Sequence, residues 1–355
     1  MAEKGRKQPK RHRKPREPPK DGVRVVPLSS IEPEEVEWFM DPLIPFGMMT
    51  LLVGDPGLGK SLLTVKFAQM AGEQGYSSIL LSAEDHKAVT IRPRLEAAGA
   101  DIDLVHTLEV RRDGVEAGLL LPEDGEELEK KVMESGARLV VVDPLSAHLA
   151  GNVNSWNDQQ VRGALAPLYR LAERHGCAVV VVAHLNKGAG TNGLYRTGGS
   201  IGVPASVRSA LLLARHPDDA DGELGSQRVL AHIKSNVAHQ AKSIKCEVVA
   251  VPVTGYDKPV PTISLRDETD LVGSELLRTG QGVTTKLDDA KEFLEDILSE
   301  GPLPVSEVLE WGKANGHSRS TLNKAKLSLK IDSYGEGKKG KGGGGKGKWL
   351  WRLPK

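Results

Sequence analysis

The sequence MMTLLVGDPGLGKSL, residues 48–62, carries the strongest structural signal in the chain. An apolar run leads directly into GDPGLGKS, which matches the pattern GxxxxGK[ST] of phosphate-binding loops. Glycines permit the dihedrals that turn successive N–H groups inward, and the start of the following helix adds positive potential. A merely structural glycine-rich turn is the alternative. We expect an ATP site formed by Gly54, Asp55, Pro56, Gly57, Leu58, Gly59, Lys60, Ser61 and Leu62.

Within this loop, two side chains have distinct expected roles. Lys60 should reach the β- and γ-phosphates, and the Ser61 hydroxyl should ligate Mg²⁺. ATP and Mg²⁺ are therefore the cofactors that the sequence predicts.

Short apolar runs alternate with amphipathic stretches around the motif. We expect buried strands over residues 48–53, 78–81, 138–142, 178–183 and 207–214, and helices over 61–74, 123–135 and 158–175. This alternation predicts an α/β fold, in which a mostly parallel sheet is covered on both faces. Residues 228–234, 244–251 and 262–265 follow one another without helices, which predicts hairpins added at one sheet edge.

The last part of the chain has a different pattern. Residues 267–285 are polar without a clear period, and we expect a linker there between an ATP-binding domain over 23–266 and a small domain over 286–355. Helical spacing over 290–298, 305–315 and 318–329 precedes a Gly/Lys repeat and the alternating segment KWLWRL at 348–353. Three helices, a loop and a closing strand predict a winged-helix domain with a basic wing, whose third helix begins at a Ser318 cap.

The formal charge of this 355-residue chain is only +1, but it is unevenly distributed. Residues 1–20 carry a net +7, residues 313–355 carry a net +10, and the stretch between them carries −16. Basic ends around an acidic body suggest a polyanionic partner, although the arm could instead be a solubilising tail. Residues 1–22 are rich in Lys, Arg and Pro, and we expect them to be a disordered basic arm.

Several classes of protein are excluded by composition. Cys177 and Cys246 are the only cysteines, so a disulfide scaffold and a Cys-based zinc site are ruled out. The apolar runs are far shorter than the roughly 20 residues of a membrane helix, and the N-terminus lacks the apolar stretch of a secretion signal. We expect an intracellular, cytoplasmic protein without a membrane partner.

Acidic side chains follow two of the expected strands. The strand RLVVVD ends in Asp143, whose carboxylate should hold the water shell of Mg²⁺ beside the phosphate loop. The strand over residues 79–83, expected next to the phosphate-loop strand, is followed by Glu84 and Asp85. Glu84 is the preferred candidate to orient an attacking water. Asp85 competes for that role, and either residue could instead cap the following helix.

One more strand end and the loop after it are of interest. His184 follows the strand over 178–183, where it could sense the γ-phosphate or serve a purely structural role. The glycine-rich loop over 188–202, with Lys187 and Arg196, could grip a nucleic-acid backbone or be an ordinary surface loop.

Taken together, five segments resemble a known family: VGDPGLGKS, LLSAEDHKAVTIRPRLEAAGA, LVVVDPLSAHL, ALAPLYRLAERHGCAVVVVAHLNKG and YRTGGSIGVPASVRSALLLA. They are similar to the RepA-type branch of RecA/DnaB-like P-loop ATPases, which includes plasmid-encoded hexameric replicative helicases and AAA-type ATPases of plasmids and phages. The resemblance covers roughly residues 36–250. It implies a RecA-like core and a homo-hexamer with single-stranded DNA in the ring.

Residue roles follow from this resemblance. It implies that Lys60 and Ser61 are the phosphate-loop pair, Glu84 the catalytic carboxylate, Asp143 the Mg²⁺-linked acid and His184 the sensor. It further implies that Arg208 is an arginine finger donated to the neighbouring subunit and that Lys234 is a second cation acting in trans. One departure concerns residues 144–157, which contain no Lys or Arg, whereas such helicases need DNA contacts in the channel.

Three functions fit these observations. The first is a DNA-dependent ATPase of replication or recombination, a ring-forming helicase or translocase. The second is an ATP-switched DNA-binding, initiator or loading factor of a plasmid, phage or mobile element. A small-molecule kinase is disfavoured because no Arg-rich lid segment is evident. The expected nucleic-acid contacts are Lys187, Arg196, Arg319, Lys324, Lys326, Lys338, Lys339 and Lys341.

Duplex DNA is the expected partner of the winged helix, although many such domains mediate protein contacts instead. Trp349 and Trp351 alternate on the closing strand, where we expect them to pack the wing rather than stack on bases.

Overall fold

The computed structural model describes residues 23, 25–155, 157–185, 202–221, 224–279, 286–299, 301–336 and 348–354. The expectations for the basic arm over 1–22 and for Lys187, Arg196, Lys338, Lys339 and Lys341 therefore lie outside the described residues.

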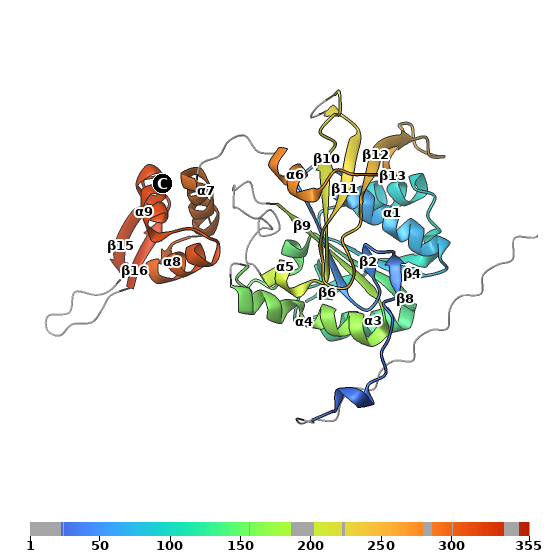
Figure 1. Ribbon diagram of the computed structural model, residues 1–355, viewed down its shortest axis with the longest axis horizontal. Helices are drawn as coiled ribbons and strands as arrows, with labels where there is room; N and C mark the ends of the chain where they lie inside the picture. Colours follow the sequence, from blue (N-terminus) through green and yellow to red (C-terminus); the bar gives the residue numbers. More distant parts are fainter. Residues whose placement is uncertain are drawn as a thin grey trace, which may run out of the picture.

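A nine-stranded sheet forms the centre of the larger unit, in the order β13-β12-β11-β10-β3-β9-β8-β4-β5 (Figure 1). Its strands are β3 Met49–Gly54, β4 Ser77–Ser82, β5 Val105–His106, β8 Ala137–Asp143, β9 Ala178–His184, β10 Ser209–Arg215, β11 Gln227–Ser235, β12 Ser243–Val251 and β13 Val260–Thr269. Two small hairpins accompany it: β1 Trp38–Met40 with β2 Ile44–Pro45, and β6 Val110–Arg112 with β7 Val115–Ala117.

Helices connect the strands. They are α1 Lys60–Glu73, α2 Arg92–Ala97, α3 Gly125–Ser135, α4 Asp158–His175, α5 Gly202–Ser206 and α6 Gly273–Thr279. Short turns of other helix types are η1 Leu28–Ser30, η2 Lys87–Ile91, η3 Ile102–Leu104 and η4 Leu145–His148. Among the described residues, no helix combines the length and apolar character needed to cross a membrane.

The six strands from β10 to β5 pair in parallel, and β11 to β13 extend the sheet in antiparallel fashion beyond β10. The predicted α/β fold with a mostly parallel sheet and an added antiparallel edge is confirmed. One expectation was wrong: β4 is not next to β3, because β9 and β8 lie between them. Strands that follow each other in sequence are neighbours only about two-thirds of the time, and here later strands fill both sides of β3.

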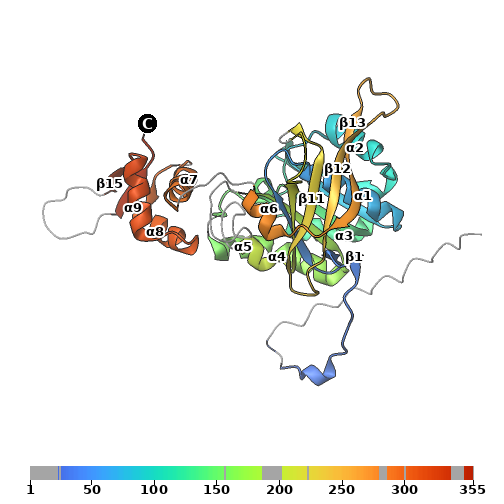
Figure 2. The same cartoon turned by 45° about the horizontal axis from the view of Figure 1, so that its top comes forward.

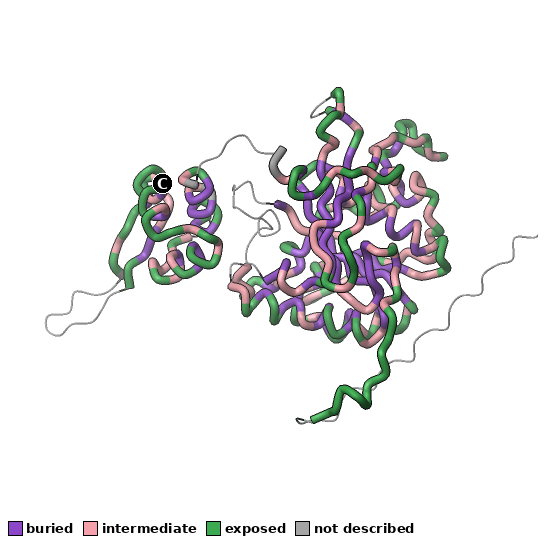
Figure 3. Tube along the Cα trace, viewed as in Figure 1, coloured by how far each residue is buried: buried purple, intermediate pink, exposed green. Residues whose placement is uncertain are grey.

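Both faces of the sheet are covered, as a parallel sheet requires. Along β3, Met49, Leu51 and Val53 face one core, which includes residues of α3 and α4, whereas Leu52 faces a second core built with α1. Figure 2 shows the helices on the two sides of the strands, and in Figure 3 the buried residues concentrate along the sheet.

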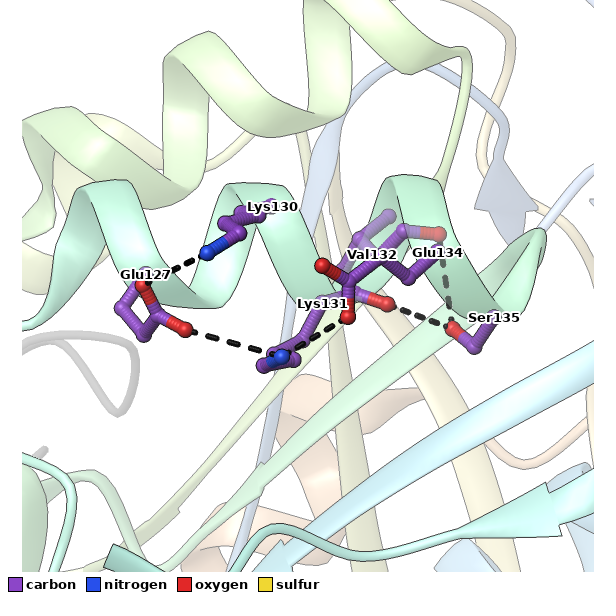
Figure 4. Close-up of polar contacts among 6 residues, drawn as sticks. All are labelled: Glu127, Lys130, Lys131, Val132, Glu134 and Ser135. Atoms are coloured by element: carbon purple, nitrogen blue, oxygen red, sulfur yellow. Dashed lines mark hydrogen bonds and ion pairs between the residues drawn. The ribbon is translucent and has the colours of Figure 1, made fainter.

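Helix α3 illustrates how the sequence chooses its buried side. Leu128 and Val132 point into the core, and its outer side carries ion pairs from Lys131 to Glu127 and Glu134 at 3.6 and 2.7 Å (Figure 4). Pairs three or four residues apart lie on one helix face and stabilise it only slightly in water. The helix is therefore oriented by its apolar stripe.

The linker expected over 267–285 starts before the larger unit ends in the structure. Residues up to Thr269 belong to β13, and the next segment forms α6, whose Leu276 is buried against the core of the larger unit. At Gly273 a Cβ atom would lie 2.2 Å from the Ile233 side chain, so the glycine permits α6 to approach β11 closely. The three leucines 271, 276 and 277 that anchor this segment were too few for a sequence period to reveal.

A second, smaller unit has its own core. It comprises α7 Lys286–Leu298, β14 Leu303–Pro304, α8 Val305–Ala314, α9 Arg319–Ser328, β15 Asp332–Glu336 and β16 Lys348–Arg352. Its antiparallel sheet has the order β14-β16-β15. Residues of all three helices and Trp351 of β16 form the core. The three helices and the closing strand lie where the sequence predicted them.

Candidate nucleotide site

The phosphate loop joins β3 to α1 at the carboxyl edge of the sheet. Gly57 and Gly59 have φ angles of 75° and 94°, which favour glycine because a Cβ atom is strained there. Helix α1 begins at Lys60, and its N-cap residue, Gly59, has no side chain to bond the N–H groups of the first turn. Uncapped N–H groups at a helix N-terminus form an anion site.

Neighbouring strands press closely against this loop. A Cβ atom at Gly54 would lie 2.4 Å from the Leu213 carbonyl oxygen of β10, so only glycine allows this approach. On the other side, Gly54 is in register with His184 of β9. The loop therefore leaves β3 between two supporting strands.

The Lys60 ammonium is held by the loop itself. Its Nζ donates to the carbonyl oxygens of Gly54 and Asp55 at 2.7 and 2.9 Å, and the residue is only 5% exposed. Burial lowers the pKa of Lys60 to about 8, against the opposing attraction of Asp143, Asp55 and Glu84. Phosphate oxygens would supply the anionic partner that a buried ammonium favours.

Asp143 lies beside the start of α1, although β9 separates its strand from β3. Burial raises the pKa of its carboxyl, and a hydrogen bond from Ser61 and the nearby Lys60 charge oppose this shift. Thr64 Oγ1 donates to the Ser61 carbonyl at 3.0 Å and lies 3.5 Å from Asp143 Oδ2. The Ser61 hydroxyl and the Asp143 carboxylate therefore meet at one point.

The residues present fit Mg²⁺ bound together with ATP. Mg²⁺ keeps several waters and is held by one or two protein oxygens plus substrate phosphates. A hydroxyl and a carboxylate at the end of the phosphate loop are such a set. Within the described residues no cluster of three His, Cys, Asp or Glu side chains could hold a metal independently. When bound, Mg²⁺ would neutralise phosphate charge.

The two competing acids after β4 have different surroundings. Asp85 forms an ion pair with Arg94 of α2 at 2.8 Å, and both side chains are about three-quarters buried. Glu84 is exposed, and its charge acts on Lys60, Asp143 and His184. The Ala83 N–H donates to the Asp143 carbonyl at 3.1 Å, which draws this loop over the end of β8. Both acids therefore lie near the site although β4 is not adjacent to β3, and Asp85 lines a pocket together with Ser61 and Asp143.

His184 ends β9 next to the phosphate loop. Burial, and then the Lys60 charge, lowers the pKa of its imidazole, which favours the neutral ring. Its buried Nδ1 has no hydrogen-bond partner among the described residues. A polar atom left in this state next to a phosphate site is available to a ligand or to a neighbouring loop.

Arg208 and Lys234 lie at the end of the sheet where the parallel strands begin, opposite the phosphate loop. The Arg208 N–H donates to the Met49 carbonyl at the start of β3, about 17 Å of strand away from Gly54. Lys234 donates to the carbonyls of Pro204 and Val207 at 2.7 and 2.9 Å, and burial, then the Arg208 charge, lowers its pKa. The exposed Arg208 side chain is too far away to reach the phosphate loop of its own chain.

The basic residues of the smaller unit divide into two groups. Arg319 and Lys324 are exposed on α9, where the Ser318 side chain accepts a hydrogen bond from Thr321 N–H as the predicted cap. Lys326 instead lies over the Trp351 ring, 5.2 Å from its centroid. Trp351 packs in the core as expected, but Trp349 is 61% exposed, so the packing expected of it is wrong. Its cross-strand partner is Gly335, which offers no side chain to cover it.

No sequence signal pointed to three residues around the nucleotide site, namely Arg94, Thr64 and Arg228, whose Nε donates to the Leu58 carbonyl. Arg94 forms an ion pair with Asp85. Thr64 donates a hydrogen bond to the Ser61 carbonyl in the first turn of α1. No sequence signal separates Arg94 from Arg92, which pairs with Glu96 instead.

Comparison with known proteins places this chain in a family. A family model described as an AAA domain matches residues 13–190, half of the chain. The chain belongs to the AAA domain family. This family consists of RecA-like P-loop ATPases, in agreement with the sheet and the phosphate loop.

Weaker similarity links this AAA domain protein to the DNA repair protein RadA. The chain is 26% identical to RadA of Bacillus subtilis over 144 residues, 40% of this chain and 28% of the relative. It is 23% identical to RadA of Chlamydia muridarum over 146 residues, 40% of this chain and 29% of that protein. RadA of Mycolicibacterium smegmatis is 34% identical over 92 residues, 23% of this chain and 20% of the relative. The chain thus aligns with less than a third of each of these relatives.

Nucleotide affinity should depend on the charge of Lys60. Below pH 8 the ammonium is already protonated, so affinity should not change with its titration. Above pH 8, binding a phosphate must first protonate Lys60, and we expect the Kd for ADP to rise up to about tenfold per pH unit. Calorimetry in buffers of different ionisation enthalpy should detect proton uptake on binding. Affinity that is flat between pH 7 and 9.5 would contradict the lowered pKa of Lys60.

The two acids after β4 should respond differently to neutralisation. We expect Glu84→Gln to lower kcat for ATP by at least about a hundredfold with little change in ADP affinity, because only the water-orienting group is lost. Asp85→Asn should mainly lower thermal stability, since it removes the partner of Arg94. Steady-state hydrolysis and thermal melts compare the two variants. The reverse pattern would assign the water-orienting role to Asp85.

Proposed function

We propose that this chain is an ATP-hydrolysing, DNA-associated motor of replication or recombination that acts as a ring-forming helicase or translocase. The observation that carries the ATPase proposal is the convergence of Lys60, Ser61, Asp143 and Glu84 at one sheet edge. In this proposal the loop N–H groups and Lys60 bind the phosphates, and Ser61 and Asp143 hold Mg²⁺. Glu84 orients and deprotonates the attacking water, and His184 senses the γ-phosphate.

The ring proposal is supported by the distance between the two sheet edges. Arg208 and Lys234 are too far from the phosphate loop of their own chain, whereas a neighbouring chain packed head-to-tail could receive them. A cation donated in this way would stabilise transition-state charge only when subunits are correctly packed. The homo-hexamer implied by the resemblance satisfies this requirement.

Association with DNA is supported by the similarity to RadA proteins, named for DNA repair, and by the smaller unit. The order of its elements, α7, β14, α8, α9, β15 and β16, with the sheet β14-β16-β15, fits a winged-helix domain. Its exposed Arg319 and Lys324, within a net +10 over residues 313–355, suit the phosphates of duplex DNA.

A second candidate is an ATP-switched DNA-binding, initiator or loading factor that does not unwind DNA. It is favoured by residues 144–157, which carry no Lys or Arg with which to hold a strand in a ring. Strand displacement on a forked DNA with ATP and Mg²⁺ separates the two candidates. Unwinding supports the motor, whereas site-specific duplex binding that survives Lys60→Ala, with no unwinding, supports the second candidate.

Mixing two inactive variants tests whether Arg208 acts in trans. Arg208→Ala keeps an intact phosphate loop, and Lys60→Ala keeps an intact Arg208. We expect each alone to hydrolyse ATP at under about 1% of the wild-type rate, and an equal mixture to recover activity, because about a quarter of the interfaces then combine both intact parts. A mixture as inactive as its components, with the same mass by light scattering as wild type, would contradict the proposal.

Lys324 and Lys326 provide a matched pair for the DNA interface. We expect Lys324→Ala to weaken duplex binding several-fold and to reduce the salt slope of log K by about 1, because one phosphate contact is lost. Lys326→Ala should change the slope less, since its ammonium lies over Trp351. Fluorescence anisotropy between 50 and 200 mM salt, about the range over which such contacts weaken, measures both. Equal effects would argue against α9 as the contacting helix.

A further inference from the structure

Arg228, the second residue of β11, contacts the phosphate loop from outside the motif. The residue is 6% exposed, and its Nε donates to the Leu58 carbonyl of the loop at 3.2 Å. Its Nη1 donates to the carbonyls of Gly225 and Gln227 at 2.7 and 2.8 Å. One guanidinium therefore joins the phosphate loop, the turn between β10 and β11, and the start of β11.

None of these partners carries a negative charge. All three are backbone carbonyls, and no ion pair to Arg228 occurs among the described residues. The nearby Asp219 carboxylate instead accepts from the N–H groups of Gln227 and Asp221 at 2.8 and 3.3 Å. Buried charges are normally paired, so this arrangement indicates a role beyond general packing. Arginine stays protonated in proteins, so the donors persist.

The contact with Leu58 determines which way one peptide group faces. In a planar trans peptide the C=O of residue 58 and the N–H of Gly59 point in opposite directions. Because Arg228 holds the Leu58 oxygen toward β11, the Gly59 N–H is turned to the other side of the peptide. A Leu58 carbonyl turned into the loop would repel phosphate oxygens, so phosphate binding requires this oxygen to face outward.

We propose that Arg228 is a positioning residue of the nucleotide site: it holds the Leu58 carbonyl out of the phosphate loop so that the Gly59 N–H is available to a phosphate. This inference rests on the proposed function only in that the loop binds a nucleotide. It requires neither hydrolysis nor a ring. Leu58 and Gly59 belong to the loop motif, whereas Arg228 lies 170 residues after Leu58 in the sequence.

The test compares Arg228→Gln and Arg228→Lys with a control on the same sheet, Arg266→Gln. Arg266 of β13 pairs with Glu247 at 2.7 Å, and its side chain is half exposed. For each variant, calorimetry gives the Kd for Mg-ADP, melting curves give Tm with and without ADP, and kinetics give KM and kcat for ATP. Lys60→Ala is measured in parallel to define the loss of nucleotide binding.

We expect Arg228→Gln to weaken ADP binding and raise the KM for ATP about tenfold, while kcat at saturating ATP stays within about twofold, because the reacting groups are untouched. The rise in Tm caused by a fixed ADP concentration should shrink. Arg228→Lys should recover part of the affinity, since an ammonium can donate to the Leu58 carbonyl but cannot span all three carbonyls. Arg266→Gln should match wild type.

A purely structural role predicts something else. In that case Arg228→Gln would lower Tm equally with and without ADP and leave the Kd unchanged, which would overturn the proposal. If the glutamine variant does not fold, an Arg228→Lys protein with lowered Tm and wild-type Kd has the same consequence. Wild-type protein that binds ADP but hydrolyses no ATP would overturn the proposed function alone. Wild-type protein that binds no ADP would overturn both.

Discussion

A buried ammonium group constrains most of the nucleotide site. Lys60 is enclosed by the carbonyls of its own loop, so the loop must curve tightly, and only glycines at positions 54, 57 and 59 permit that path. The desolvated charge also requires anions nearby, which Asp143 partly supplies from two strands away. Arg228 and Leu213 support the loop from β11 and β10. A loop held by these contacts has the tight curvature that phosphate binding requires, which lowers the cost of binding.

The nucleotide-binding groups and the Arg208 and Lys234 cations lie at opposite ends of the parallel strands. Groups that bind and activate a nucleotide gather where the parallel strands end, as expected for an open α/β sheet. Arg208 and Lys234 lie where those strands begin. Since a strand cannot bend back on itself, the length of β3 keeps these cations from their own phosphate loop. In the proposed assembly, each site would be completed by the far edge of the next copy.

Much of this arrangement could be predicted from local sequence. The buried runs of Val and Leu in β8 and β9 are too apolar to be anything but central strands, and the loop motif fixed the place of Lys60 and Ser61. Features that depend on spatial neighbours could not be predicted in this way. The separation of β4 from β3, the Asp85–Arg94 pair and the position of Lys326 over Trp351 each join residues whose spacing has no periodic signature. Glu84 was favoured over Asp85 as the acid that orients water, and this choice stays a prediction, whereas the expected position of its strand next to β3 was wrong.

Helix α6 is the last element of the larger unit before the chain continues to the smaller one. It packs on β10 and β11, and Gly273 lies against Ile233 of β11. The next residue, Lys234, donates to the Val207 carbonyl, just before Arg208. The chain leaves the larger unit through this helix on its way to α7. Because α6 contacts β10 and β11, a force transmitted along the chain from the smaller unit would act on these two strands before it reached the phosphate loop.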